Sequence, residues 1–293
     1  MTFSKPPEDA SSDGHTLPEL AAWRGGTVLE TGTEVVSAMI VDRVGLVVLD
    51  QPDRRNALHP GMFETVPRLL EGFAADPEIG AVMITGAGTT FCAGGDVRRK
   101  VENAGGTVAE RTAGLTHNAR MATLLSDISK VTIAALPGAA VGAGLSIALA
   151  ADLRIAASSS KLIAGWGDLA FSGDFGGTWF LTRLLGPSRA MEFMVSGAPM
   201  TMPQAREWGL VNRVVPDAEF AAAALDWATA VAGGPRLAWA ATKRNIGRAT
   251  TMDLAQALPA ESEEMVRSGL TDEHRDAVRA WVERARSRQG RRG

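Results

Sequence analysis

The residues best suited to chemistry stand in a glycine-rich turn near the middle of the chain. The apolar run Val131–Leu136 begins with β-branched residues, which predicts a buried strand. Residues 145–151 are apolar on every side, which predicts a buried helix. Gly142, Ala143 and Gly144 stand just before that helix. The first N–H groups of a helix lack partners within it and carry partial positive charge, so this turn is suited to hold a negatively charged oxygen. The alternative is a turn kept small only for packing, and this stretch alone favours both interpretations equally.

The same stretch carries no charge from Val131 to Ala151. By length alone it resembles a membrane span, since about 20 apolar residues suffice. Pro137, Gly138 and the glycines that follow interrupt it, so it is better explained as a strand, a turn and a helix. We therefore predict no membrane segment.

Composition narrows the class of protein. The chain has 293 residues, 45% of them hydrophobic and 22% charged, which is typical of a soluble globular protein. Its net charge of −3 argues against general nucleic-acid binding. The single cysteine, Cys92, excludes an internal disulfide framework and fits a reducing compartment. Residues 1–15 lack the apolar core of a signal peptide. These features predict a cytoplasmic protein.

The elements that must position the turn follow an α/β pattern. Strands alternate with helices to about residue 215, which predicts a mostly parallel sheet covered on both faces. We expect a mobile N-terminal arm over 1–31, an α/β core over 32–215 and a helical region over 216–293. Strands are expected at 35–42, 43–50, 81–85, 131–136, 153–157, 161–164 and 211–215. Helices are expected at 59–75, 109–129, 145–151, 178–185, 189–195, 202–208, 219–232, 237–247, 252–268 and 272–286.

Several common site motifs are missing from the sequence. It has no Walker loop, no GxGxxG after a strand and no GxSxG nucleophile elbow. The four histidines are scattered, and Cys92 stands alone, so we predict no metal site. Two glycine turns remain, FCAGGD at 91–96 and the turn at 138–146, together with the pattern PDRRNAL at 52–58.

In combination, these three segments resemble the crotonase (enoyl-CoA hydratase/isomerase) superfamily. The likeness extends from about residue 34 to about residue 286, through LTRLLGPSRAMEFMVSG and AREWGLVNRVV. The resemblance implies a crotonase-like spiral of ββα repeats with a C-terminal helical region that assembles trimers or dimers of trimers. It also implies an acyl-CoA substrate and no separate cofactor.

The resemblance further assigns roles to individual residues. The N–H groups of Gly95 and Ala143 would hold the thioester oxygen as it gains negative charge, with a position near Ala93 as the alternative for the first donor. The CoA molecule itself would be bound by residues at both ends of the chain. The nucleotide end would meet Asp53, Arg54 and Arg55, and Trp281 would pack on the CoA of an adjacent subunit.

The sequence departs from the superfamily where hydratases carry their two glutamates. Those positions hold Ser146 and Trp166, neither of which can act as a carboxylate base. Trp166 and Asp174 instead fall where the 4-chlorobenzoyl-CoA dehalogenase branch has its substrate-stacking tryptophan and nucleophilic aspartate. The helper histidine of that branch aligns near Ala119, with His117 close by.

Each of these side chains also has a plainer explanation. Asp174 could cap a loop or helix, and Trp166 could be ordinary core rather than an acyl-stacking residue. Ser146 could bind water or substrate, or simply hydrogen-bond to its own backbone. Asp168 fits a surface loop acid.

Three functions follow from this pattern. The leading hypothesis is a hydratase/isomerase-type enzyme in which Asp174 moves a proton or activates water beside an enolate. The second is a hydrolase or dehalogenase in which Asp174 is a covalent nucleophile. The third is a non-catalytic acyl-CoA-binding protein.

Overall fold

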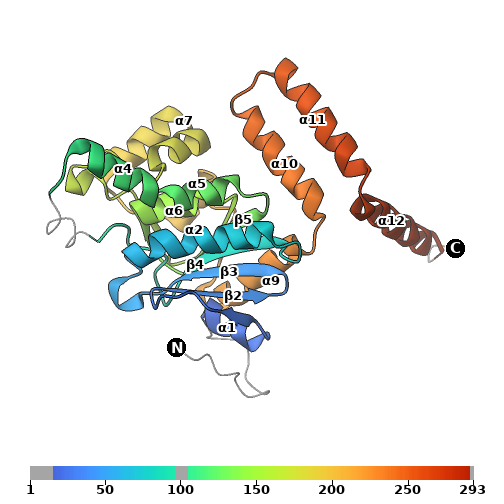
Figure 1. The fold of residues 1–293 in the computed structure, drawn as a ribbon, viewed down its shortest axis with the longest axis horizontal. Coiled ribbons are helices and arrows are strands. Elements are labelled where there is room, and N and C mark those ends of the chain that lie inside the picture. The colour runs from blue at the N-terminus through green and yellow to red at the C-terminus, as the bar shows by residue number, and fades with distance from the viewer. Residues whose placement is uncertain (1–15, 97–104, 291–293) are drawn as a thin grey trace. The chain divides into compact units, whose positions relative to one another are not determined.

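The computed structural model describes residues 16–96 and 105–290 (Figure 1). The chain divides into two compact units, one ending at Ala232 and the other beginning at Gly233. The first unit contains every strand that the structure describes, and the second is helical.

The first unit is built on a seven-stranded sheet with the order β1-β2-β3-β4-β5-β7-β10. The strands β1, β2 and β3 pair antiparallel, and every later pairing in this sheet is parallel. The predicted parallel-rich sheet is therefore confirmed. The strands are β1 (Thr27–Leu29), β2 (Val36–Val41), β3 (Val44–Leu49), β4 (Ala81–Gly86), β5 (Val131–Leu136), β7 (Leu153–Ala157) and β10 (Arg213–Val215).

The first unit also contains a second sheet of three short strands, which lie along the chain among the later strands of the first sheet. This second sheet consists of β6 (Ala140–Val141), β8 (Lys161–Ile163) and β9 (Met200–Thr201). The uncharged central stretch thus becomes β5, β6 and α6 (Ala143–Ala150). Among the described helices, none combines the length and the apolar character that a membrane crossing requires.

Helices cover both faces of the seven-stranded sheet (Figure 1). Side chains of β3 alternate between the faces: Val47 and Leu49 join one core cluster, and Leu46 and Val48 join the other. All six residues of β3 are buried, as expected for a strand covered on both sides. The first cluster packs under α2 (Pro60–Ala75), α5 (Arg120–Asp127), α6, α7 (Gly177–Ser196) and α8 (Met202–Glu207), and the second under α1 (Leu17–Trp23) and α9 (Phe220–Ala232).

The predicted boundaries need correction at several places. The part of the expected arm that the structure describes forms α1 and β1, and Leu20 and Ala21 are fully buried against the sheet. Residues 1–15 lie outside the described residues. The predicted helix 109–129 is two helices, α4 (Val108–Asn118) and α5, which meet at Ala119. The two helices predicted on either side of Gly186 are confirmed: they share the label α7, but the backbone at Gly186 is non-helical, with a φ of +75° and a ψ of 165°. Helix α9 belongs to the first unit rather than to the C-terminal region.

The second unit comprises three helices, α10 (Arg236–Ala249), α11 (Leu254–Gly269) and α12 (Asp272–Gly290). Helices α10 and α11 pack against each other through an ionic cluster. The carboxylate of Glu264 accepts hydrogen bonds from Arg244 Nε at 2.8 Å and Nη2 at 2.6 Å, and from Arg248 Nη1 at 3.2 Å. The bonds from Arg244, followed by those from Arg248, lower the pKa of Glu264 from 4.5 to about 2.

We predict that Glu264→Gln lowers the free energy of unfolding by about 1–2 kcal/mol near neutral pH, because it removes the charge that both arginines face. The ionised carboxylate stabilises the fold above its unfolded pKa near 4.5, and this contribution is lost as the pH falls towards 2. Urea unfolding followed by circular dichroism at several pH values measures the difference. The control Glu263→Gln removes an exposed pair with Arg267 and should have a much smaller effect. Equal losses from both variants would contradict the assignment.

Candidate active site

The two glycine turns predicted from the sequence lie side by side. They follow the neighbouring parallel strands β4 and β5, whose carboxyl ends lie at the same edge of the sheet. Cys92 forms a parallel bridge with Ala140, and Val141 N–H donates to the Cys92 carbonyl at 3.0 Å. Gly95 and Ala143 each stand three residues beyond the bridged pair. The register therefore brings the two predicted oxyanion donors to corresponding positions in adjacent segments.

Glycine is required where the turns touch. A Cβ built on Gly94 would lie 2.6 Å from the Val141 carbonyl oxygen and 3.3 Å from the Ala143 nitrogen. A Cβ on Gly144 would lie 2.4 Å from the Cys92 carbonyl oxygen. Gly94 also has a φ of +80°, which side chains disfavour. The two turns thus meet backbone to backbone.

Hydrogen bonds distinguish the N–H groups of the first turn. The N–H of Ala93 donates to the Arg55 carbonyl at 2.9 Å, and that of Gly94 donates to Cys92 Sγ at 3.4 Å. Among the described residues, none is recorded as accepting a hydrogen bond from Gly95 N–H. Burial raises the pKa of the Cys92 thiol to about 12, so this sulfur remains a protonated packing group. Of these three N–H groups, that of Gly95 is the one without an acceptor in the part of the chain that the structure describes.

The second turn offers a donor at the start of a helix. Gly142 N–H donates to the Ile163 carbonyl at 3.0 Å, whereas no described residue is recorded as accepting from Ala143 N–H. Ala143 is the first residue of α6, where the helix dipole adds partial positive charge. The geometry therefore suits an oxygen that carries negative charge.

The PDRRNAL loop is bonded directly to the first turn. Leu58 N–H donates to the Gly94 carbonyl at 2.8 Å, and Arg54 Nη1 lies 3.0 Å from Asp96 Oδ2. Asp53 and Arg55 are exposed. For the Arg55 guanidinium, no partner is recorded among the described residues. The loop thus brings close to the turn a cation that has no partner within residues 16–96 and 105–290.

Asn56 is a site residue that the sequence analysis missed. It is fully buried, its Oδ1 accepts from Gln51 N–H at 2.9 Å, and its Nδ2 donates to the carbonyls of Ala87 and Thr90 at 2.9 and 2.7 Å. These bonds fix the loop against the segment that precedes the first turn. Asparagine tolerates the positive φ of 55° found here. The sequence signal for a structural role of this residue was its place directly before the apolar residues Ala57 and Leu58.

Asp174 lies in the loop before α7, and both its side chain and its backbone carbonyl accept hydrogen bonds. Trp166 Nε1 donates to Asp174 Oδ1 at 2.8 Å. The Asp174 carbonyl accepts from Gly177 N–H at 2.9 Å and from Ser146 Oγ at 2.8 Å. The carboxylate is half-buried, and no described residue is recorded as a partner of its Oδ2. One carboxylate oxygen is therefore fixed while the other remains available.

Trp166 packs between this acid and the second glycine turn. Its side chain is 5% exposed, so it offers little surface for stacking in this structure. A Cβ on Gly142 would lie 3.8 Å from Trp166 Nε1, and a Cβ on Gly177 would lie 2.5 Å from Trp166 Cη2. The indole is thus packed between the turn that presents Ala143 and the start of α7. The Asp174 carboxylate consequently lies in the neighbourhood of the Ala143 N–H.

Within the first unit, other candidate residues lie outside this constellation. His117 Nε2 is 2.8 Å from Glu64 Oε1 on exposed surface, and Ala119 packs against the core. Asp168 is exposed. Trp281 is an exposed residue of α12 in the second unit. Within the described ranges, no group of three or more histidine, cysteine or acidic side chains is placed to hold a metal ion.

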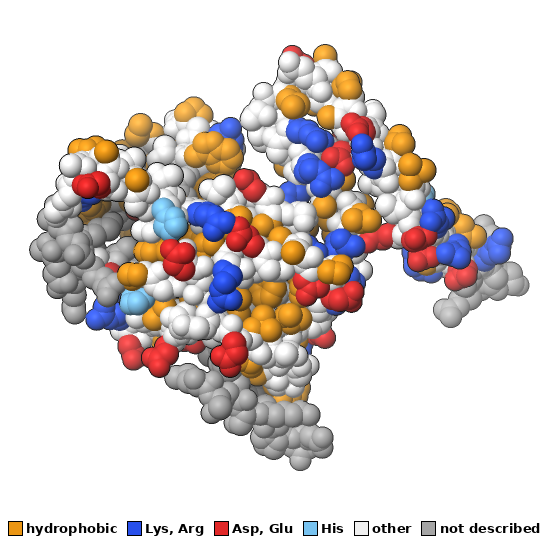
Figure 2. Space-filling view, in the orientation of Figure 1, with side chains coloured by type: hydrophobic (Ala, Val, Ile, Leu, Met, Phe, Trp, Pro, Cys, Tyr) orange, Lys and Arg blue, Asp and Glu red, His pale blue; other side chains and the backbone are white. Residues whose placement is uncertain are grey.

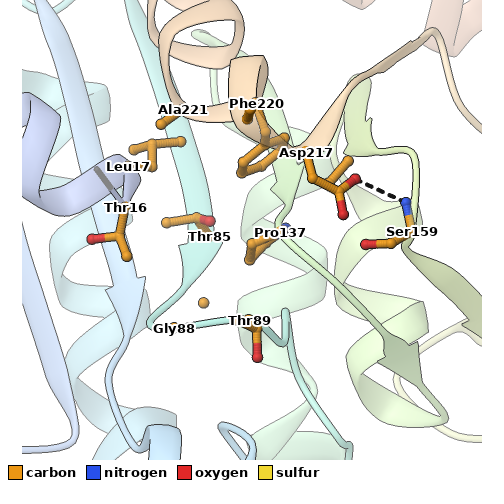
Figure 3. A pocket seen from close by; sticks show the side chains of 13 residues that line it. Thr16, Leu17, Thr85, Gly88, Thr89, Pro137, Ser159, Asp217, Phe220 and Ala221 are labelled. Atoms are coloured by element: carbon orange, nitrogen blue, oxygen red, sulfur yellow. Dashed lines mark hydrogen bonds between the residues drawn. The ribbon is translucent and has the colours of Figure 1, made fainter. Parts of the chain in front are cut away.

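A separate pocket of about 230 Å³ opens between the carboxyl ends of β4 and β5 and the helices α1 and α9 (Figure 3). Its lining includes Leu17, Phe220 and Ala221, which belong to the core under α1 and α9. At its rim, Asp217 Oδ1 accepts from Ser159 N–H at 3.0 Å. None of the residues predicted to bind or transform a substrate lines it.

Comparisons with known proteins agree with this fold. The sequence profile of the enoyl-CoA hydratase/isomerase family matches residues 40–290. The 1,2-epoxyphenylacetyl-CoA isomerase of Escherichia coli is 31% identical over 85% of this chain and 95% of its own length. The 4-chlorobenzoyl coenzyme A dehalogenase-2 of Arthrobacter sp. is 27% identical over 80% and 85%. A structure from Thermobifida fusca, described as an enoyl-CoA hydratase in complex with CoA, has a TM-score of 0.74 and 28% identity over 81% and 93%.

The fold and the family match define an α/β protein of the crotonase superfamily. The chain belongs to the enoyl-CoA hydratase/isomerase family and is an enzyme of this type. The crotonase-like fold inferred from the glycine turns is therefore confirmed.

We predict that Gly94→Ala lowers the free energy of unfolding by at least about 3 kcal/mol, because a methyl group must displace backbone atoms of the second turn. The matched control is Gly88→Ala. Gly88 has a similar φ of +68°, but its Cβ would meet only Pro52 Cβ at 3.5 Å, so about 1 kcal/mol is expected. Chemical denaturation of both variants measures the difference. Equal losses would show that the contact between the turns contributes little.

Proposed function

We propose that this enzyme isomerises an acyl-CoA thioester through an enolate. The N–H groups of Gly95 and Ala143 hold the thioester oxygen, and Asp174 transfers the proton. The observation that carries the proposal is the Trp166–Asp174 hydrogen bond of 2.8 Å, packed beside the turn that presents Ala143. It supports a half-buried carboxylate held next to an oxyanion site.

Isomerisation suits a site with one acid. A single carboxylate can take a proton from one carbon and return it to another, while the N–H groups stabilise the enolate between the two steps. Removing one such donor typically costs about 3 kcal/mol of transition-state stabilisation. The conventional hydration mechanism of the superfamily uses two glutamates, whose positions here hold Ser146 and Trp166. The name of the Escherichia coli relative, an isomerase of a phenylacetyl-CoA derivative, supports this choice.

The CoA portion is proposed to bind along the PDRRNAL loop. The family match and the CoA complex of the Thermobifida fusca relative support an acyl-CoA ligand. Arg54 and Arg55 are both exposed, but Arg54 is already paired with Asp96. Arg55 is therefore the better phosphate partner. Asp53 would flank it. The mechanism uses side chains and backbone only and calls for no separate cofactor.

Assembly into trimers or dimers of trimers is proposed for the second unit. Helices α10 and α11 carry hydrophobic side chains on their exposed surface (Figure 2). Ile246, Leu254 and Met265 are among them. Trp281 would then reach the CoA of an adjacent subunit. The single buried cysteine supports a reducing compartment, for which the cytoplasm is proposed.

A second candidate function is covalent catalysis. The Trp166–Asp174 bond and the similarity to a dehalogenase favour it, since a carboxylate held at one oxygen can attack carbon through the other. The attack would expel the group that the carbon carries, halide from a ring carbon or CoA thiolate from the thioester, and would leave an ester or a mixed anhydride of Asp174. Water would then add to the side-chain carbonyl carbon of Asp174 and release the product. After a single turnover in H₂¹⁸O, this route places ¹⁸O in Asp174, which mass spectrometry of the peptide detects. Unlabelled Asp174 after turnover excludes it.

We predict that Asp174→Asn lowers the rate at least about 1,000-fold, because the amide cannot accept the proton. Mass spectrometry of an acyl-CoA library that includes phenylacetyl and alicyclic esters identifies the substrate. Hydrogen–deuterium exchange at the α-carbon of phenylacetyl-CoA in D₂O reports enolate formation directly. CoA affinity should stay within about threefold of wild type. Asp168→Asn, an exposed acid of the same loop, should keep its rate. Undiminished exchange in Asp174→Asn would refute the assignment.

We predict that Arg55→Ala weakens CoA binding about 5- to 10-fold at low ionic strength, because a phosphate loses its cationic partner. The loss should shrink in 1 M salt, where the Debye length is about 3 Å. Isothermal titration calorimetry with CoA measures both values. The control Arg24→Ala removes an arginine paired with Asp226 at 2.6 Å on the α1 side of the sheet, and it should leave binding unchanged. A salt-independent loss in Arg55→Ala would argue against a phosphate contact.

A further inference from the structure

Ser146 makes a hydrogen bond that its place in a helix does not explain. It lies on α6, three residues after Ala143, and is fully buried. A serine hydroxyl within a helix ordinarily bonds the carbonyl four residues back. Here that carbonyl, of Gly142, is 3.4 Å away, whereas the Asp174 carbonyl is only 2.8 Å away. The hydroxyl therefore bonds mainly across to the loop that carries the acid.

The start of α7 closes tightly over this bond. A Cβ on Gly177 would lie 2.6 Å from Ser146 Oγ, so glycine alone fits there. Gly177 N–H also donates to the Asp174 carbonyl, at 2.9 Å. That carbonyl thus receives two donors, one from α6 and one from α7, which fixes the backbone of Asp174 from both sides.

We propose that Ser146 is a positioning residue that sets the distance between the acid and the oxyanion donor. Ser146 and Ala143 belong to the same short helix, so a bond from Ser146 to Asp174 ties the acid to the element that presents the Ala143 N–H. The inference rests on the proposed function, in which Asp174 acts on an enolate held at that N–H. A misplacement of about 1 Å can cost about 100-fold in rate, so a single restraint of this kind matters.

The same packing explains why a serine stands at a position where hydratases carry glutamate. Ser146 is fully enclosed, and its Oγ already lies against Gly177. A longer acidic side chain would collide with the start of α7 and separate it from α6. The site therefore has room for one acid at this place, and Ser146 positions that acid through its hydrogen bond to the Asp174 carbonyl.

The test is the rate of α-hydrogen exchange of phenylacetyl-CoA in D₂O, followed by mass spectrometry at several substrate concentrations. Ser146→Ala should lower kcat about 10- to 100-fold and leave KM within twofold, because the acid is displaced while CoA contacts remain. The matched control is Ser160→Ala. Ser160 is also fully buried, and its hydroxyl donates to a backbone carbonyl, that of Leu136, at 3.0 Å, with no hydrogen bond to the Asp174 loop among the described residues. It should keep the wild-type kcat.

The outcomes separate this inference from the proposed function. If wild type exchanges, Asp174→Asn does not, and Ser146→Ala matches wild type, the positioning role is wrong and the proposed function stands. If wild type exchanges the α-hydrogen of no ester in the acyl-CoA library, both are overturned. Equal losses of kcat in Ser146→Ala and Ser160→Ala would reduce Ser146 to a structural hydroxyl. Should Ser146→Ala fail to fold, Ser146→Cys, a weaker donor of similar size, carries the same test.

Discussion

The site depends on one constraint, the backbone contact between two turns that leaves no room for a Cβ. Gly94 and Gly144 meet the opposite turn at distances that only glycine permits. The parallel pairing of β4 and β5 delivers both turns to one edge of the sheet, and the Cys92–Ala140 bridge sets their register. The side chain of Asn56 donates hydrogen bonds to the carbonyls of Ala87 and Thr90, in the segment that precedes the first turn. The sheet, the bridge and the buried amide thus serve to bring two N–H groups together.

The acidic side of the site is organised by contacts between α6 and α7. Trp166 fixes the carboxylate, while Ser146 and Gly177 fix the backbone carbonyl of the same residue. Trp166 donates a hydrogen bond to the carboxylate of Asp174, and Ser146 links α6 to its backbone. In the proposed function, this arrangement positions Asp174 to move one proton beside an enolate.

Much of this organisation could be predicted from the sequence. The strand–turn–helix pattern around Ala143 and the parallel sheet follow from local apolar periodicity and glycine placement, so both could be predicted. Helix α1 resembles part of a mobile arm because the residues before it are polar. Its start nevertheless carries a helix signal, since Thr16 N–H donates to the Glu19 carboxylate at 2.8 Å in a capping box and Pro18 stands in the first turn. The break at Ala119, in contrast, has no glycine or proline to mark it. Trp166 could be aligned with a stacking residue, but its burial and its bond to Asp174 depend on tertiary packing.

The central claim is that one carbonyl oxygen meets two backbone donors with Asp174 beside it. A crystal structure of the Asp174→Asn variant with bound phenylacetyl-CoA tests this most directly. The account predicts a thioester oxygen about 2.7–3.1 Å from the nitrogens of both Gly95 and Ala143, with the side chain at position 174 facing the α-carbon. An oxygen that contacts neither nitrogen, or a side chain at 174 turned towards bulk solvent, would contradict it.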